Sequence, residues 1–576
     1  MNKITNLIKV IKEEFAFFLI TTILLLQNTI FSWRDWTIFN VLTFTTSSLF
    51  FSYLATSFCY HTKSKIAKCI LYFIFTSLCF INIFLRFQFH TRISPNIIQL
   101  LIETNIQESI GFIRTYHYSM FPIICLVGVG AFIFFVTFLE RKKNILFFTK
   151  IKYLHEILIT LTFLGFPSVC FSYFTLFKCK ETIEVEQWVI KYQTSPMDNI
   201  TNLVYSIYDV YLMNKDLEIA IVSSLSVKEK TKTKGDSLTI ILVIGESFNK
   251  YHSNIYGYYL DTNPKLSEEK KNGRLYAFTN VFSPYNLTSK ALKNMLSTNC
   301  LGDGENWADY PFFPSIFYRA GYNVDFWDNQ YDPLSQNSYD FSLNSFLHNP
   351  IIKDLSYTSI NTHDYKLDHE LINNYYSERQ ELKSNMNFII FHLMGQHFLY
   401  YDRFPHNEEF DHYTTDSIKQ NLSFLTPMSK KVIADYDNAT RYNDSVVGMI
   451  INHYKTRNAV LIYLSDHGEE IFDYQDRQGR SWEKPIPKQV IKYQYEIPFF
   501  IWCSDIYQNK HPDIISNILS ATNKPFSSDN LCHVLFHLGQ IETMYYKAER
   551  DLISPTYKCP RIIINNVFEY KKEDFH

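Results

Sequence analysis

Two short polar motifs in the second half of the chain contain residue types that bind metals. Glu246 follows the apolar run Leu238 to Ile244, which reads as a buried strand. Asp466 and His467 follow a similar run, 459 to 464. Zinc accepts carboxylate oxygens and imidazole nitrogens as ligands. A solvated loop glutamate and an ordinary Asp-His dipeptide are the alternatives that spacing alone leaves open.

A hydroxyl group could complete such a site. Thr288 precedes a helix-compatible stretch, so its simplest role is that of an N-cap whose hydroxyl accepts a backbone hydrogen bond. The same placement puts the hydroxyl at the positive end of a helix, where a phosphate is also stabilised. Metal coordination lowers the pKa of a hydroxyl and makes it a nucleophile at neutral pH. We therefore expect a metal bound by Glu246, Asp466 and His467 with a hydroxyl nucleophile nearby.

Three further apolar runs indicate more strands of the same domain. The segment 321–330 ends in Asp328-Asn329-Gln330, the segment 387–397 contains His392 and His397, and the segment 495–502 is apolar throughout except for one glutamate. Helical patterns such as Lys430 to Tyr454 separate the strands, which predicts an α/β domain with a mainly parallel sheet between helices. Ligands of such sheets bind beyond the carboxyl ends of the strands, where these polar residues would meet.

The first 180 residues have a different character, since long apolar runs recur there. The chain has 576 residues and a formal net charge of −2, so nothing indicates nucleic-acid binding. A buried helical core is the alternative for any single run, but five of them predict a five-helix transmembrane domain. The runs lie near Phe15 to Phe31, Trp36 to Cys59, Ile66 to Leu85, Phe121 to Leu139 and Ile157 to Phe177.

Basic residues between these runs predict the orientation. Short loops rich in Lys and Arg stay in the cytoplasm, and five crossings that start inside end outside. No small-residue cleavage site follows the first run, so we interpret it as an anchor. We expect a transmembrane domain over 1–180, a linker with interfacial helices over 181–236 and an outer domain over 237–576. The clusters are Lys3, Lys9 and Lys12; Lys63, Lys65 and Lys68; and Arg141, Lys142, Lys143, Lys150 and Lys152.

Ten cysteines are present, and four of them lie in the outer domain, where disulfides are permitted. These four allow three pairings, which sequence does not rank. No CxxC metal pattern occurs. The four are Cys300, Cys503, Cys532 and Cys559.

An ordered set of motifs resembles the membrane-bound phosphoethanolamine transferases of the alkaline phosphatase and sulfatase superfamily. The resemblance runs from about residue 15 to 560 and includes the five-crossing N-terminal half. The threonine without flanking cysteines is similar to the branch that modifies the lipopolysaccharide core, since Pro284 and Asn294 stand at the cysteine positions of the lipid A branch. The motifs are IGESFNKYHSNIYGYYLDTNP, SPYNLTSKALKNMLS, DFWDNQ, HLMGQH, YDNATRYNDSVV and LSDHGEE.

The resemblance implies an enzyme of the bacterial inner membrane, multi-pass, with its catalytic domain in the periplasm. Thr288 would attack the phosphorus of phosphatidylethanolamine and form a phosphoethanolamine-threonine intermediate. The group would then pass to lipopolysaccharide, on a core sugar or lipid A, or to another envelope glycan. One zinc ion, with a second left open, would be held by Glu246, Thr288, Asp466 and His467.

The resemblance also assigns substrate contacts. His397 matches a histidine that contacts the transferred phosphate or a second metal, and Asn329 falls where the family binds phosphoethanolamine. A further family histidine is missing between 477 and 495, and Arg480 or Lys484 could substitute for it.

Two rival functions stay open at this stage. A phosphoglycerol transferase or a sulfatase-like hydrolase of the same superfamily would use the same metal and threonine. A catalytically silent membrane protein that organises envelope partners would have no need to retain the nucleophile and three ligands.

Overall fold

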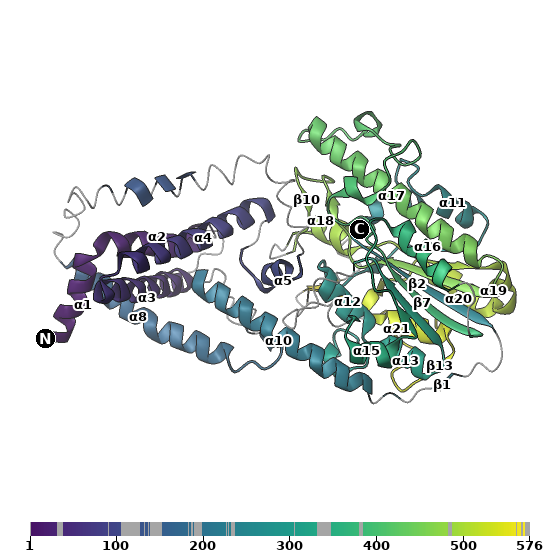
Figure 1. Ribbon diagram of the computed structural model, residues 1–576, viewed down its shortest axis with the longest axis horizontal. Coiled ribbons are helices and arrows are strands. Elements are labelled where there is room, and N and C mark those ends of the chain that lie inside the picture. Colours follow the sequence, from purple (N-terminus) through teal and green to yellow (C-terminus); the bar gives the residue numbers. More distant parts are fainter. Residues whose placement is uncertain are drawn as a thin grey trace. The chain divides into compact units, whose positions relative to one another are not determined.

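The computed structural model divides into two compact units, Met1–Asn214 and Lys215–His576 (Figure 1). It describes residues 2–31, 38–89, 92–104, 153–182, 199–225, 230–231, 237–303, 306–330, 347–379, 384–481, 486–559, 562–565 and 568–570, with isolated residues between 127 and 138, between 184 and 188, and at 227. The predicted linker boundaries, 181 and 236, stay a prediction.

The secondary structure elements of the first unit, among its described residues, are all helices. Two of its helices contain segments that are, by length and composition, long and apolar enough to cross a membrane: Lys65–Phe87 and Leu154–Leu176. The predicted crossing near 121–139 lies largely outside the described residues, so the five crossings stay a prediction. The helices are α1 Asn2–Glu13, α2 Phe15–Phe31, α3 Ile38–Thr62, α4 Lys65–Phe89, α5 Pro95–Glu103 and α8 Leu154–Leu176; α10 Asn199–Leu225 continues past the boundary between the units.

A seven-stranded sheet forms the centre of the second unit, in the order β3-β11-β8-β2-β7-β5-β6. The pairs among β8, β2, β7, β5 and β6 are parallel, whereas β11 is antiparallel to β8 and β3. The predicted α/β domain is confirmed, with a mixed sheet. The strands are β2 Leu238–Gly245, β3 Leu275–Phe278, β5 Asn323–Asp328, β6 Ser359–Ile360, β7 Met386–His392, β8 Ala459–Ser465 and β11 Phe499–Cys503.

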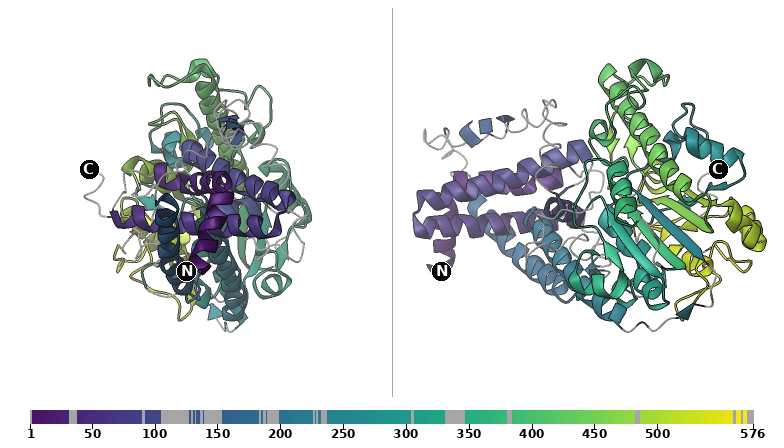
Figure 2. Two further views of the ribbon diagram at one scale, coloured as in Figure 1. Left: turned by 90° about the vertical axis from the view of Figure 1, so that its left-hand side faces the viewer. Right: turned by 45° about the vertical axis from the view of Figure 1, so that its right-hand side comes forward.

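Helices cover both faces of this sheet (Figure 2). All eight residues of β2 are buried, as expected of a central strand. Ile240, Leu242 and Ile244 join the core on one face, while Ile241 and Val243 join the core on the other. The first core includes side chains of α12 Thr288–Leu296, α13 Phe313–Arg319, α15 Pro350–Ser356, α20 Pro512–Ala521 and α21 Leu531–Leu538; the second includes α11 Pro264–Lys271, α16 Asp368–Glu378 and α17 Pro427–Tyr454.

The strand predicted at 495–502 begins later than expected. β11 starts at Phe499, because residues 491–495 form a π-helical turn and Pro498 has no N–H for a ladder bond. Short elements complete the unit: β1 Lys230–Thr231, β4 Val281–Phe282, β9 Glu470–Ile471, β10 Gln478–Gly479, β12 Phe526–Ser527, β13 Ile541–Glu542, β14 Ile562–Ile564, β15 Phe568–Tyr570, α18 Lys488–Val490 and α19 Asp505–Lys510.

Candidate active site

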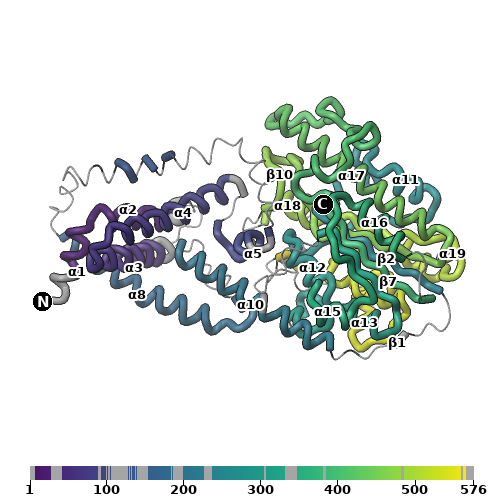
Figure 3. The backbone as a smooth tube through the Cα atoms, in the orientation of Figure 1, coloured from purple at the N-terminus to yellow at the C-terminus, as the bar shows by residue number. Residues whose placement is uncertain are grey.

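The register of the sheet brings the two predicted ligand motifs together. β2 pairs in parallel with β8, and Gly245 stands opposite Ser465 at the end of the pairing. The next residues, Glu246 and Asp466, therefore leave the sheet side by side. One ligand atom each from Glu246, Asp466 and His467 lies within 4.8 Å of the others, and all three side chains are buried. The tube view follows β2 beside its other parallel neighbour, β7 (Figure 3).

Hydrogen bonds aim the ligand atoms into the site. The Nδ1 of His467 lies 2.8 Å from the Gly468 carbonyl oxygen and donates to it, so the lone pair of the imidazole is on Nε2, the nitrogen that faces the site. Asp466 Oδ1 accepts from the backbone N–H groups of Ser247 at 3.1 Å and His467 at 2.7 Å. Asp466 Oδ2 is buried without a hydrogen-bond partner and lies 3.1 Å from His467 Nε2.

The charges of the site fit a divalent cation. Burial, and then the charge of Glu246, raises the pKa of the Asp466 carboxyl well above its usual value. Burial also raises the pKa of Glu246, but His467, His397 and Arg480 outweigh it and the net pKa is lowered. Burial and Arg480 lower the pKa of His467 to about 3, so its imidazole is neutral. Two adjacent buried carboxyls, an unpartnered oxygen and a neutral imidazole are a donor set suited to zinc.

Thr288 reaches this group from α12. Its hydroxyl donates to Glu246 Oε2 at 3.1 Å and lies 3.2 Å from His467 Nε2, and the side chain is partly exposed. The predicted N-cap role was wrong, because α12 begins at Thr288 and Leu287 occupies the cap position without a side-chain hydrogen bond. The hydroxyl points to the carboxylate instead of to its own helix.

The segment that contains His397 lies close against Glu246. The Gln396 N–H donates to the Glu246 carbonyl oxygen at 3.0 Å. Gly395 has φ +49°, and a Cβ added there would lie 2.9 Å from Glu246 N. Burial lowers the pKa of His397 to about 4, and its Nδ1 is buried without a hydrogen-bond partner.

Asn329 is already engaged within the protein. Its Nδ2 donates to Asp368 Oδ1 at 2.7 Å, and its Oδ1 accepts from the Tyr365 N–H at 2.9 Å. Within the described part of the chain, neither Asn329 nor His397 has a side-chain hydrogen bond to Thr288. Their substrate contacts stay predictions.

Two residues that were not among the predicted site residues also contact Glu246. Ser247 Oγ donates to Glu246 Oε1 at 2.6 Å, and Gln330 Nε2 donates to Glu246 Oε2 at 3.2 Å. Both stand in the predicted strand-end motifs, so their position after a strand is the feature of the sequence that could have indicated their contact with Glu246.

The guanidinium of Arg480 lies beside the predicted metal ligand His467. Its Nη1 lies 2.9 Å from His467 Nε2, and its Nε lies 3.7 Å from Glu469 Oε2. The role of Arg480 as a substitute for the missing histidine stays a prediction. Lys484 lies outside the described residues.

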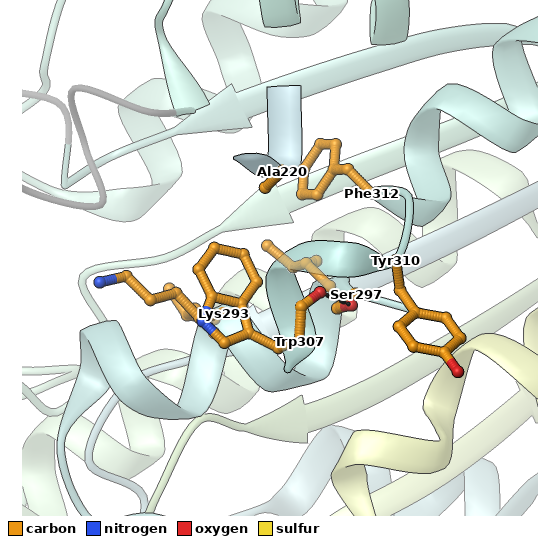
Figure 4. Close-up of a pocket in the computed structure, with 8 residues that line it drawn as sticks. Ala220, Lys293, Ser297, Trp307, Tyr310 and Phe312 are labelled. Carbon is orange, nitrogen blue, oxygen red and sulfur yellow. Dashed lines mark hydrogen bonds between the residues drawn. The ribbon is translucent and has the colours of Figure 1, made fainter. Parts of the chain in front are cut away.

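A small cavity lies near the other end of α12 (Figure 4). Its volume of about 10 Å³ holds roughly one water molecule. None of the predicted site residues lines it, so it is separate from the candidate active site. The lining residues are Ala220, Leu292, Lys293, Leu296, Ser297, Trp307, Tyr310 and Phe312.

The family model described as Sulfatase matches residues 239–541. This range contains every predicted site residue. The chain belongs to the sulfatase family. Phosphoethanolamine transferase EptC of Escherichia coli strain K12 is 29% identical over 352 residues, which are 60% of this chain and 57% of that protein. The chain thus spans little more than half the length of this relative.

The chain is also similar to solved structures. The C-terminal periplasmic domain of EptC from Escherichia coli, in a complex with Zn, has a TM-score of 0.50 and 26% identity, and the match covers 60% of this chain and 93% of that one. The integral membrane protein EptA, lipooligosaccharide phosphoethanolamine transferase A of Neisseria meningitidis, has a TM-score of 0.61 and 16% identity, with 96% of this chain and 99% of that one covered. The second likeness shows that the fold extends over nearly the whole chain.

Proposed function

We propose that this sulfatase-family chain is a zinc-dependent phosphoethanolamine transferase that takes the group from phosphatidylethanolamine and passes it to lipopolysaccharide, on a core sugar or lipid A, or to another envelope glycan. One observation carries the proposal: the Thr288 hydroxyl lies within hydrogen-bond distance of both Glu246 and His467. The similarity to EptC supports the identity of the transferred group.

Four residues would hold the zinc ion: Glu246, Thr288, Asp466 and His467. When bound, zinc supplies a positive charge that lowers the pKa of the Thr288 hydroxyl and offsets negative charge on the phosphate. Glu246 Oε2 accepts the Thr288 hydroxyl hydrogen bond and orients the oxygen for attack. The partial exposure of Thr288 leaves that oxygen accessible to a substrate.

The transfer takes place in two steps. In the first, the Thr288 hydroxyl gives up its proton as its Oγ1 bonds to phosphorus, the bond from phosphorus to the diacylglycerol oxygen breaks, and that oxygen takes up a proton. In the second, the acceptor hydroxyl gives up its proton as its oxygen bonds to phosphorus, the bond from phosphorus to Thr288 Oγ1 breaks, and Oγ1 takes up a proton. The guanidinium of Arg480 and the N-terminal end of α12 both favour the negative charge of the phosphate.

The proposal includes residues that contact the transferred group. His397 is neutral at neutral pH and lies near Glu246, so it can hydrogen-bond a phosphate oxygen without adding charge. Asn329 would contribute through its remaining amide proton. Within the described residues, no other cluster of three His, Cys, Asp or Glu side chains is close enough together to bind a second metal ion.

We also propose that the chain is a multi-pass protein of the bacterial inner membrane with its catalytic domain in the periplasm. The candidate spans in α4 and α8, and the fold shared with EptA, support this location. A lipid donor is confined to the bilayer, so a membrane anchor raises its concentration around the active site.

Headgroup transfer by purified full-length variants tests the proposal. The donors are phosphatidylethanolamine and phosphatidylglycerol with labelled headgroups, and the acceptor is purified lipopolysaccharide. We expect T288A to lose transfer and T288S to retain part of it. The control T279A should match the wild type, because the Thr279 side chain is exposed and its hydroxyl donates to the Thr522 carbonyl oxygen and to Asn523 Oδ1, away from the predicted site residues. Full activity of T288A would refute the mechanism, and transfer of glycerol phosphate or simple hydrolysis would favour the rival functions.

A further inference from the structure

A buried triad of charged residues includes one residue from each of the two segments that supply the predicted metal ligands. The imidazole of His252 has no exposed surface, and its Nδ1 lies 2.6 Å from Asp437 Oδ1. Its Nε2 lies 3.3 Å from Asp473 Oδ1. His252 follows Glu246 by six residues, and Asp473 follows His467 by six residues. The triad therefore joins one ligand segment to the other.

The imidazole has a carboxylate on each side, and this arrangement is satisfied when both ring nitrogens carry a proton. Burial lowers the pKa of His252, but Asp437 and Asp473 outweigh burial and raise the pKa to about 10. The ring is thus a fixed cation at neutral pH. A buried charge that loses one of its partners is costly, so the three groups hold each other in place.

The carboxylates extend the connection on both sides. Asp473 Oδ2 accepts from Asn249 Nδ2 at 3.0 Å and from the Ile471 N–H at 2.9 Å. Asp437 Oδ2 accepts from the Tyr258 hydroxyl at 2.9 Å. The segment after Glu246 is thereby bound to the triad by a second side chain, that of Asn249, and the segment after His467 by the backbone of Ile471.

Helix α17 provides the fixed side of this arrangement. Asp437 lies within α17, and its neighbour Tyr436 donates its hydroxyl to the Ser247 carbonyl oxygen at 2.6 Å. The same hydroxyl accepts from the Asn249 N–H at 2.7 Å. Residues 247 to 252 are therefore held to one rigid helix at several points after β2 has ended.

We propose that His252 is a positioning residue whose ion pairs with Asp437 and Asp473 set the distance between Glu246 and the pair Asp466 and His467. Its two ion pairs within the described residues are with Asp437 and Asp473, so it acts on the predicted metal ligands through the two segments. This inference rests on the metal site of the proposed function and does not depend on which group is transferred.

Zinc affinity of the full-length protein tests the inference. We expect H252Q to bind zinc roughly 10- to 100-fold more weakly, the loss usual for residues that orient metal ligands. Without zinc, amide hydrogen exchange over 246–252 and 466–473 should be faster in H252Q. The control H537Q breaks another His–Asp pair, in which His537 Nδ1 lies 2.5 Å from Asp551 Oδ2. His537 lies on α21, a helix that supplies no predicted site residue. We expect H537Q to keep wild-type zinc affinity within about twofold.

Wild-type zinc affinity and exchange in H252Q would overturn the inference. If H252Q does not fold, D473N decides, because it removes one carboxylate charge and leaves the pair with Asp437; wild-type affinity in D473N would then overturn it. Failure of both variants to fold while H537Q folds would assign the triad to folding alone and reject the positioning role. If the wild type binds no zinc, the proposed function fails, and the exchange measurement still decides whether the triad positions the segments.

Discussion

The close approach of Gly395 to Glu246 makes G395A a sensitive probe of the site. Gly395 has φ +49°, and placing alanine in the left-handed region costs roughly 1–2 kcal/mol. The new Cβ would also lie 2.9 Å from Glu246 N and 3.0 Å from Glu246 O, where ordinary contact begins at 3.4 Å. The Glu246 backbone must therefore move by a few tenths of an ångström. Metal–ligand distances tolerate deviations of about 0.2 Å, so we expect zinc affinity and turnover to fall on the order of tenfold or more.

A matched control separates strain from displacement. Gly273 has φ +71°, and an added Cβ would meet nothing within 4 Å. G273A should lose a similar amount of stability and keep zinc affinity and transfer. The measurements are the free energy of unfolding, zinc titration against a competing chelator, and headgroup transfer by the full-length chain. If G395A and G273A were equal in zinc affinity and turnover, the placement of Glu246 in the metal site would be refuted.

Three other expectations follow from the charges of the domain. The pKa of His252 is raised from 6.5 to about 10, so the stability that comes from its protonation is fully present below pH 6.5 and is lost as the pH rises to 10. Between these pH values the unfolding free energy of the wild type should fall more steeply than that of H252Q, by at most about 1.4 kcal/mol per pH unit. Equal slopes would contradict the charged triad. R480Q removes a cation 2.9 Å from His467 Nε2, so zinc should bind more tightly, on the order of tenfold, while transfer slows; weaker binding in a zinc titration would argue against this role. Chelation should abolish transfer and lower the melting temperature until zinc is restored, and transfer that survives with no bound metal would rule out metal dependence.

Much of the fold of the second unit could be predicted from apolar runs. The strands β2, β5, β7 and β8 begin within two residues of their predicted starts, because each is a run that is buried on both faces. The start of β11 was missed, since the apolar pattern extended across a π-helical turn and Pro498. Strand direction is not encoded in such a run, so the antiparallel placement of β11 could not be read from it.

The clustering of Glu246, Asp466 and His467 was predictable for a similar reason. Glu246 and Asp466 directly follow parallel strands, and parallel neighbours end at the same edge of a sheet. The orientation of Thr288 was not predictable, because a residue at a helix start can turn its hydroxyl either to its own backbone or to a distant carboxylate. In the triad, His252 lies more than 180 positions before both Asp437 and Asp473 in the sequence, so local spacing does not reveal the contact.

The most direct measurement is the identification of the residue that carries the transferred group. Full-length protein is loaded with zinc, incubated with phosphatidylethanolamine in the absence of an acceptor, digested and analysed by mass spectrometry. We predict one added phosphoethanolamine on the peptide that contains Thr288, and its disappearance when lipopolysaccharide is added. An adduct on a different residue, or full transfer with no adduct at any time, would contradict the account.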